Sequence, residues 1–158
     1  MKPLDPRVID MLNDVLTAEL TAINQYFVHS EMCRNWGYAR LAAVLRERSM
    51  EEMKDAQELI EHILYLEGLP NLQRLGTIRV GESVPEDLQL DADLERSAIG
   101  ALSEAIAHCA QVGDFHTRGM LETMVAGEEE QLDWLETQQT TIGQVGLQNY
   151  LSQQIHGE

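Results

Sequence analysis

The stretch PRVIDMLNDVLTAELTAINQYF (residues 6–27) decides the fold that the sequence predicts. Its apolar side chains recur every three or four residues, as they do on one face of an amphipathic helix. They are Val8, Leu12, Val15, Leu16, Ile23 and Phe27. Glu19 falls on the same stripe. Asp5 and Pro6 suit an N-cap and a first helical position, so we expect a helix over residues 6–36.

The same helical period recurs along the rest of the chain and predicts an all-α protein. Gly and Pro interrupt it between residues 68 and 85, where they favour a long connection. We therefore expect a single domain over residues 1–158, built as an up-down four-helix bundle with a long crossover between its second and third helices. The expected helices cover residues 6–36, 41–67, 90–112, 114–142 and 146–155, the last being a short fifth helix.

The chain is strongly acidic, with 27 Asp and Glu against 11 Lys and Arg and a formal net charge of −16. This balance argues against binding to nucleic acid or to anionic membranes. It is compatible with cations, and equally with a charge that serves only solubility. No signal peptide or membrane-spanning run is found, and Cys33 and Cys109 lack metal-site spacing. We expect a soluble, cytoplasmic protein.

Each of the four long predicted helices carries an acid on its buried stripe: Glu19, Glu52, Glu95 and Glu128. The first two and the last two are separated by the same 33 residues (19 to 52 and 95 to 128). Residues equidistant from the turn of an antiparallel hairpin lie at one height, so four carboxylates should meet in the core. The alternative is that one or two of them lie at the surface. No Lys or Arg is found on these stripes near that level, so a divalent metal is expected.

Four stretches give the chain a resemblance to the bacterioferritins over nearly its whole length: AELTAINQYFVHS (18–30), EEMKDAQELIEHILYLEGLPNLQRLG (51–76), GEEEQLDWLETQ (127–138) and GLQNYLSQQI (146–155). The resemblance implies a ferritin-like four-helix bundle that assembles into a shell of 24 subunits and stores iron as ferric mineral. It also implies haem b shared between two subunits. A di-iron ferroxidase centre would lie within each subunit, with one Glu from each of two helices and Glu-x-x-His from each of the other two.

All four glutamates of that centre have a match here. Glu19 and Glu95 match the single glutamates, and Glu52 and Glu128 match those of the two Glu-x-x-His motifs. They are the residues that the resemblance assigns to metal binding.

Neither histidine of the two motifs is present, because Asp55 and Gln131 stand at these positions. A ligand set made of oxygen alone favours Mg²⁺, Ca²⁺ or Mn²⁺ over iron. We therefore expect slow or absent iron oxidation and assign no catalytic residue. The retained carboxylates leave open the alternative of a self-sufficient ferroxidase with a carboxylate-rich site.

Met53 follows Glu52 and points about 100° away from the core stripe. By itself it is typical of interface packing, but it matches the methionine that the family uses as an axial haem ligand. A thioether is a ligand suited to an electron-transfer haem. The residues that match the lining of the haem pocket are Leu20, Ile23, Asn24 and Phe27. The spacing of Arg46 from Met53 suggests a contact with a haem propionate.

Glu47 and Glu51 belong to an acidic strip on the second helix, which is either a solvated face or a cavity lining where iron enters and mineral nucleates. The resemblance also implies a bacterioferritin-associated [2Fe–2S] ferredoxin that docks on residues 69–72, near Glu82 and Glu86. We expect a subunit for iron storage and haem-mediated iron release, which shares its shell with a second, catalytically intact bacterioferritin chain. An unrelated carboxylate-bundle enzyme is the third and least favoured interpretation.

Overall fold

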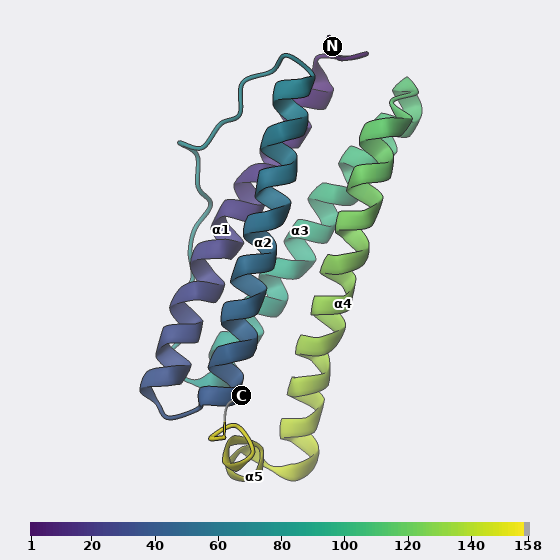
Figure 1. Ribbon diagram of the computed structural model, residues 1–158. Helices are drawn as coiled ribbons and strands as arrows, with labels where there is room; N and C mark the ends of the chain where they lie inside the picture. The colour runs from purple at the N-terminus through teal and green to yellow at the C-terminus, as the bar shows by residue number, and fades with distance from the viewer. Residues whose placement is uncertain (157–158) are drawn as a thin grey trace.

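In the computed structural model the chain is all-helical, and the structure describes residues 1–156 (Figure 1). The helices are α1 (Arg7–Asn35), α2 (Ala39–Tyr65), α3 (Val84–Val112), α4 (Phe115–Val145) and α5 (Leu147–Ser152). Helices α1 and α2 form one antiparallel hairpin, and α3 and α4 form a second one beside it. The predicted four-helix bundle with a short C-terminal helix is confirmed. No helix of the described part is long and apolar enough to cross a membrane.

A crossover of extended chain joins the end of α2 to the start of α3 and runs along α1 (Figure 1). Polar side chains of α1 accept hydrogen bonds from its backbone N–H groups: Asn13 from Asn71 at 2.8 Å, Thr21 from Gly76 at 2.8 Å and Gln25 from Arg79 at 3.1 Å. These bonds fasten the exposed crossover to α1, since it has no sheet or helix ladder of its own. The crossover can thus span the length of the bundle, and all four long helices run up and down.

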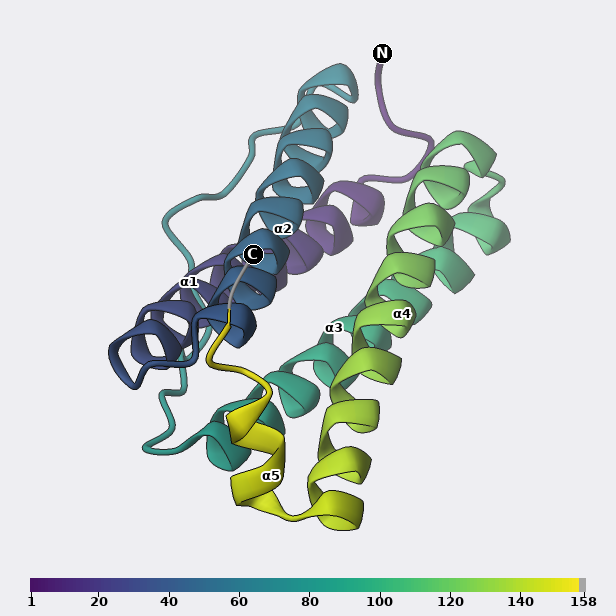
Figure 2. The same ribbon diagram turned by 60° about the horizontal axis from the view of Figure 1, so that its bottom comes forward.

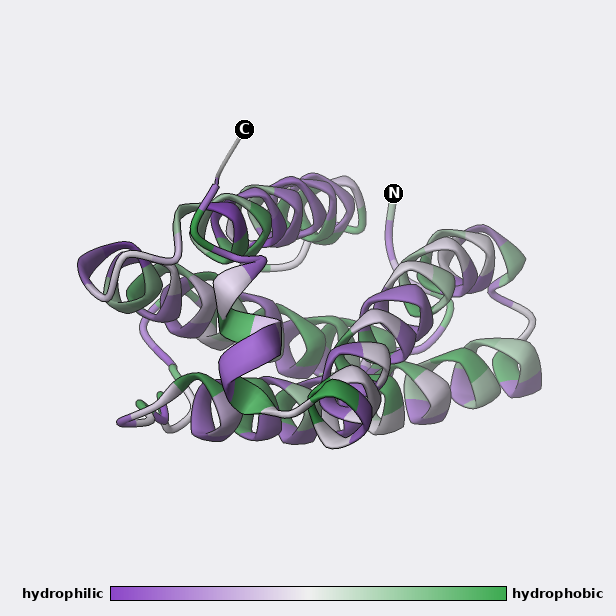
Figure 3. Cartoon of the chain, turned by 90° about the horizontal axis from the view of Figure 1, so that it is seen from below, coloured by the Kyte–Doolittle hydropathy of each residue, from purple (hydrophilic) through white to green (hydrophobic). Residues whose placement is uncertain are grey.

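The core consists of two clusters of apolar side chains, one toward each end of the bundle. One contains Leu12, Leu59, Leu102 and Leu121, one residue from each long helix. The other is closed by α5, whose Tyr150 is buried and donates its hydroxyl to Gln138 at 2.8 Å. Figures 2 and 3 show α5 lying across the end of the bundle, and the hydropathy colours of Figure 3 show apolar and polar faces on the helices. The buried faces of the four long helices carry Glu19, Glu52, Glu95 and Glu128, one on each helix.

Helices α3 and α4 are longer than the sequence-based expectation. Helix α3 begins at Val84, not near residue 90, because Ser83 accepts a hydrogen bond from the backbone of Glu86 at 3.3 Å and acts as the N-cap. Pro85 lies in the first turn, where a missing N–H costs nothing. Helix α4 continues past the expected stop at residue 142 and ends before Gly146, which has a φ of 88°. Pro85 interrupts the helical pattern of the sequence but is well accommodated at a helix start.

Candidate metal centre

The structure brings the four glutamates together in the core, one from each long helix. Glu19, Glu52, Glu95 and Glu128 are each at most 1% exposed. One oxygen from each of Glu19, Glu52, Glu128 and the half-buried Asp55 lies within 4.8 Å of the others. Carboxylate oxygens that converge in this way are ligands for a hard divalent cation. The equal spacing along the two hairpins therefore corresponds to an actual meeting point of the side chains.

A positive charge already occupies this meeting point, so the expectation that no Lys or Arg lies near it is wrong. The guanidinium of Arg48, on α2, donates to Glu128 at 2.8 Å and lies 3.7 Å from Glu95. The same nitrogen contacts Glu52, one helical turn further along α2. Arg48 is 7% exposed, so the whole side chain is turned inward. Arg48 precedes Glu52 by four residues, and residues four apart share a helix face. This spacing was the signal that sequence reasoning missed.

Burial and like charge act together on the acids of the centre. Burial raises the pKa of Glu19 well above its ordinary value, and the carboxylates of Glu128 and Asp55 raise it further. Burial and the charge of Glu128 raise the pKa of Asp55 to about 6. Carboxylates at such short separations cannot all be ionised unless cations or protons compensate them. The centre thus takes up protons wherever positive charge does not reach.

Glu95 is tied to Tyr26 as well as to Arg48. The phenol of Tyr26 donates to Glu95 with an oxygen–oxygen distance of 2.5 Å. Burial and the neighbouring Glu128 raise the pKa of Glu95, while Arg48 and Tyr26 act in the opposite direction. Burial lowers the pKa of Arg48, but Glu128 and Glu95 more than offset this and raise it above its ordinary value. Arg48 therefore remains a cation at any physiological pH.

No histidine belongs to the converging group among the described residues. Asp55 supplies a carboxylate where the family pattern has an imidazole, and the side-chain nitrogen of the half-buried Gln131 has no hydrogen-bond partner. Three of the five histidine rings have polar partners elsewhere: His29 with Asp87 and Asp91, His62 with Thr117, and His108 with Asp5. Oxygen ligands and a bound guanidinium do not fit a resident di-iron cofactor held partly by imidazole.

The residues expected around a haem lie at the outer face of α1 and α2. Met53 is 49% exposed and Phe27 is 46% exposed, although both are large apolar side chains. The guanidinium carbon of Arg46 lies 5.7 Å from the centre of the Phe27 ring, a cation–π geometry. Leu20 and Ile23 are half-buried against the core, and the exposed Asn24 donates to the Leu20 carbonyl at 2.8 Å. The exposed thioether of Met53 is free to ligate a haem iron.

The acidic strip and the expected docking segment are both exposed. Glu47 and Glu51 lie at the surface of α2, and Glu51 accepts a hydrogen bond from Arg48 at 3.1 Å. Glu51 thus connects the surface to the buried centre. On the crossover, Leu69 is 83% exposed and Leu72 is 54% exposed. Both leucines are therefore accessible to a docking molecule.

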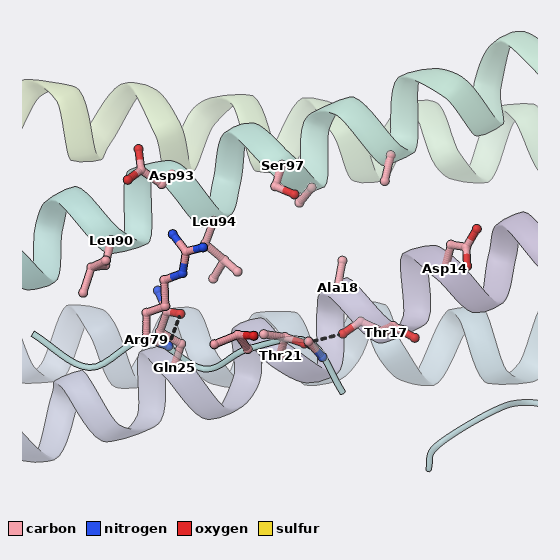
Figure 4. A pocket seen from close by; sticks show the side chains of 14 residues that line it. Asp14, Thr17, Ala18, Thr21, Gln25, Arg79, Leu90, Asp93, Leu94 and Ser97 are labelled. Atoms are coloured by element: carbon pink, nitrogen blue, oxygen red, sulfur yellow. Dashed lines mark hydrogen bonds between the residues drawn. The ribbon is translucent and has the colours of Figure 1, made fainter. Parts of the chain in front are cut away.

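A cavity of about 410 Å³ lies between α1, α3 and the crossover. Figure 4 shows Arg79 extending from the crossover toward α3, between Gln25 of α1 and Leu94 of α3. Its lining combines Thr21, Gln25 and Asp93 with small apolar side chains. None of the six expected metal ligands lines it. This cavity and the carboxylate centre are separate features of the molecule.

Comparison with known proteins gives a consistent result. The family model described as "Ferritin-like domain" matches residues 9–145. A bacterioferritin of Mycobacterium leprae is 44% identical over 149 residues, which cover 94% of each chain. A bacterioferritin of Rhodobacter capsulatus is 42% identical over 146 residues, and one of Brucella melitensis is 40% identical over the same length. Each of these two alignments covers 92% of this chain and 91% of the relative.

Proposed function

Because this chain belongs to the bacterioferritin family, we propose that it is an iron-storage subunit that releases iron through haem and has little ferroxidase activity of its own. Iron storage follows from the family. The donor set of the centre supports the proposed loss of oxidation activity, and the exposed Met53 and Phe27 support the proposed haem role. These two features lie on different faces of α2, so one helix links them.

One observation carries the proposal: the carboxylates that should hold iron converge without an imidazole and around a guanidinium. Iron would enter as substrate, and rapid oxidation by oxygen requires it to be held by these side chains. A unit positive charge 4 Å from a divalent ion costs roughly 8 kcal/mol at an effective dielectric constant of about 20. Fe²⁺ must therefore compete with Arg48 for the same oxygens, and it finds weaker ligands at residues 55 and 131.

Met53 is the proposed axial ligand of a haem b shared by two subunits. Phe27, Leu20 and Ile23 would cover the porphyrin, Asn24 would lie at its edge, and Arg46 would pair with a propionate. The support is the exposure of Met53 and Phe27, two large apolar side chains that the single chain leaves uncovered. Haem bound there would supply one-electron transfer between the surface and stored iron.

The proposed assembly is a cytoplasmic shell of 24 subunits that includes a second bacterioferritin chain with both Glu-x-x-His motifs intact. That chain would oxidise entering iron. Glu47 and Glu51 would bind iron at the inner surface of the shell and nucleate mineral there. A [2Fe–2S] ferredoxin would dock on residues 69–72 and deliver electrons for release. The exposed Leu69 and Leu72 support this surface.

A self-sufficient ferroxidase is the second candidate function. It is favoured by the convergence of four carboxylate oxygens within 4.8 Å, which is close enough to share a cation if Arg48 moves away. In that case Asp55 would take the place of one missing imidazole. The two candidate functions differ in the rate of iron oxidation. A measurement of haem binding does not distinguish them.

Stopped-flow oxidation of Fe(II) by the purified homopolymer separates them. Our proposal expects no fast phase that saturates at two irons per subunit, and slow oxidation that continues with added iron. Mixed shells with an intact bacterioferritin chain should oxidise iron in proportion to the intact chain. A fast, saturating phase in the homopolymer would rule out the proposed loss of activity.

A further inference from the structure

We propose that Arg48 is the resident cation of the carboxylate centre, and that removing its charge converts the centre into a binding site for a divalent cation of the Mn²⁺ class. The inference deepens the proposed loss of ferroxidase activity, on which it rests for its biological meaning. Its physical basis is independent of haem, of shell composition and of any partner. Arg48 links three of the four long helices at the level of the glutamates.

The position of Arg48 is that of a metal, not of a surface ion pair. One of its terminal nitrogens contacts acids from three helices: Glu52 on α2, Glu95 on α3 and Glu128 on α4. A guanidinium presents several N–H donors in a fixed plane, so one side chain can serve several carboxylates at once. A divalent cation bridging helices would take the same oxygens.

The second terminal nitrogen of Arg48 points the other way. It donates to Glu51 at 3.1 Å, and the Glu51 side chain is 49% exposed. The guanidinium thus lies between the buried acids and the surface, across the side of the centre that Glu51 borders. A cation approaching from there meets a positive charge before it meets the glutamates.

The centre retains carboxylate oxygens that could ligate a metal. Both carboxylate oxygens of Glu19 are buried and have no hydrogen-bond partner among residues 1–156, and Glu19 is 1% exposed. One oxygen of Glu128 and one of Glu95 are also without a partner. Unpartnered buried acids aimed into a common space are costly, and they are the ligands that Mn²⁺ prefers. Arg48 contacts Glu52, Glu95 and Glu128 but does not reach Glu19.

Two consequences follow for the protein as it is made. The centre needs no metal to be stable, because Arg48 compensates the acids that it contacts and protons compensate acids such as Glu19 that it does not reach. Chelators should therefore leave the melting temperature unchanged. A bacterioferritin subunit of this kind would fold and assemble equally well in iron-poor and iron-rich cells.

The test compares the assembled protein with its Arg48→Gln variant, which keeps most of the side-chain length and removes the charge. Mn(II) is titrated at pH 7 and free Mn(II) is measured by electron paramagnetic resonance. We expect Arg48→Gln to bind one more Mn(II) per chain than the wild type, roughly tenfold more tightly than the exposed acids do. In chelator its melting temperature should fall by roughly 10 °C, and Mn(II) should restore it.

Two controls fix the location of the added site. Arg118→Gln removes the same charge from an exposed pair with Glu122 and should gain no Mn(II). Arg48→Gln combined with Glu19→Gln and Glu128→Gln should lose the added Mn(II) again. Should Arg48→Gln fail to assemble in chelator, assembly recovered by Mn(II) would support the inference, and failure in both conditions would overturn it.

The inference is overturned if Arg48→Gln binds no more Mn(II) than the wild type, or if chelator already lowers the melting temperature of the wild type. These outcomes are separate from failure of the proposed function. Slow iron oxidation by the wild type with no gain of Mn(II) in Arg48→Gln would sink the inference alone. A gain of Mn(II) in a protein that binds no haem would sink only the haem-mediated role.

Discussion

The guanidinium of Arg48 and the carboxylate of Glu128 are joined by a hydrogen bond of 2.8 Å, although 80 residues separate them in the chain. Arg48 belongs to the α1–α2 hairpin and Glu128 to the α3–α4 hairpin, so the bond links the two halves of the bundle. Both side chains are buried. Removing either partner of such a pair is destabilising, because it leaves the other charge buried and unpaired.

The coupling between Arg48 and Glu128 can be measured by a double-mutant cycle. We expect Arg48→Gln alone to lower the free energy of unfolding by about 3–5 kcal/mol, because several buried acids lose their cation. Glu128→Gln should cost less in the Arg48→Gln background than in the wild type, with a coupling of about 1–3 kcal/mol. Denaturant unfolding in chelator gives these values. Additive effects would show that the two side chains do not interact.

The hydrogen bond from Tyr26 to Glu95 supports the same centre from α1. Tyr26→Phe removes the donor and keeps the ring, so we expect a loss of about 1–3 kcal/mol in the free energy of unfolding. The matched control is Tyr38→Phe, since the hydroxyl of the half-buried Tyr38 makes no hydrogen bond within the described residues. Equal losses in the two variants would mean that the bond to Glu95 contributes nothing.

The buried cluster of His29, Asp87 and Asp91 predicts an unusual pH dependence. Burial raises the pKa of Asp87 from 3.8 to about 6, although His29 partly opposes this. The folded protein therefore holds a proton that the unfolded chain has released, and the stability contribution of Asp87 falls as pH rises from 3.8 to about 6. The pKa values of Asp91 and His29 are also raised, which has the same sign.

Asp87→Asn should flatten the stability curve across that window, measured by denaturant unfolding at a series of pH values in chelator. Asp93→Asn, at an exposed position of α3, is the control and should leave the slope as it is. An unchanged slope in Asp87→Asn would contradict the assignment of the proton to this cluster.

Haem binding through Met53 is tested by Met53→Leu after reconstitution with haem. We expect loss of the bis-thioether absorption spectrum, because leucine has no ligand atom. Met50→Leu changes another exposed methionine of α2, 47% exposed against 49% for Met53, and should keep the spectrum. A wild-type spectrum in Met53→Leu would remove the residue from the haem site.

The sequence was sufficient for the bundle and for the height at which its acids meet. Equal spacing of Glu19 from Glu52 and of Glu95 from Glu128 placed all four carboxylates, because antiparallel helices have a fixed rise. It was not sufficient for Arg48. In a pattern of apolar and acidic stripes arginine is expected at the surface, whereas its guanidinium can be buried where several carboxylates bind it. The carboxylates that bind Arg48 come from three helices, so their proximity is a property of the folded bundle.

Anomalous scattering from crystals soaked in Mn(II) tests the central claim most directly. The account predicts no anomalous peak among Glu19, Glu52, Glu95 and Glu128 in the wild type, with density for the Arg48 guanidinium between Glu52 and Glu128. The same soak of Arg48→Gln should give one peak there. Strong peaks in the wild type, with Arg48 displaced toward the surface, would contradict the claim that this side chain stands in place of a metal.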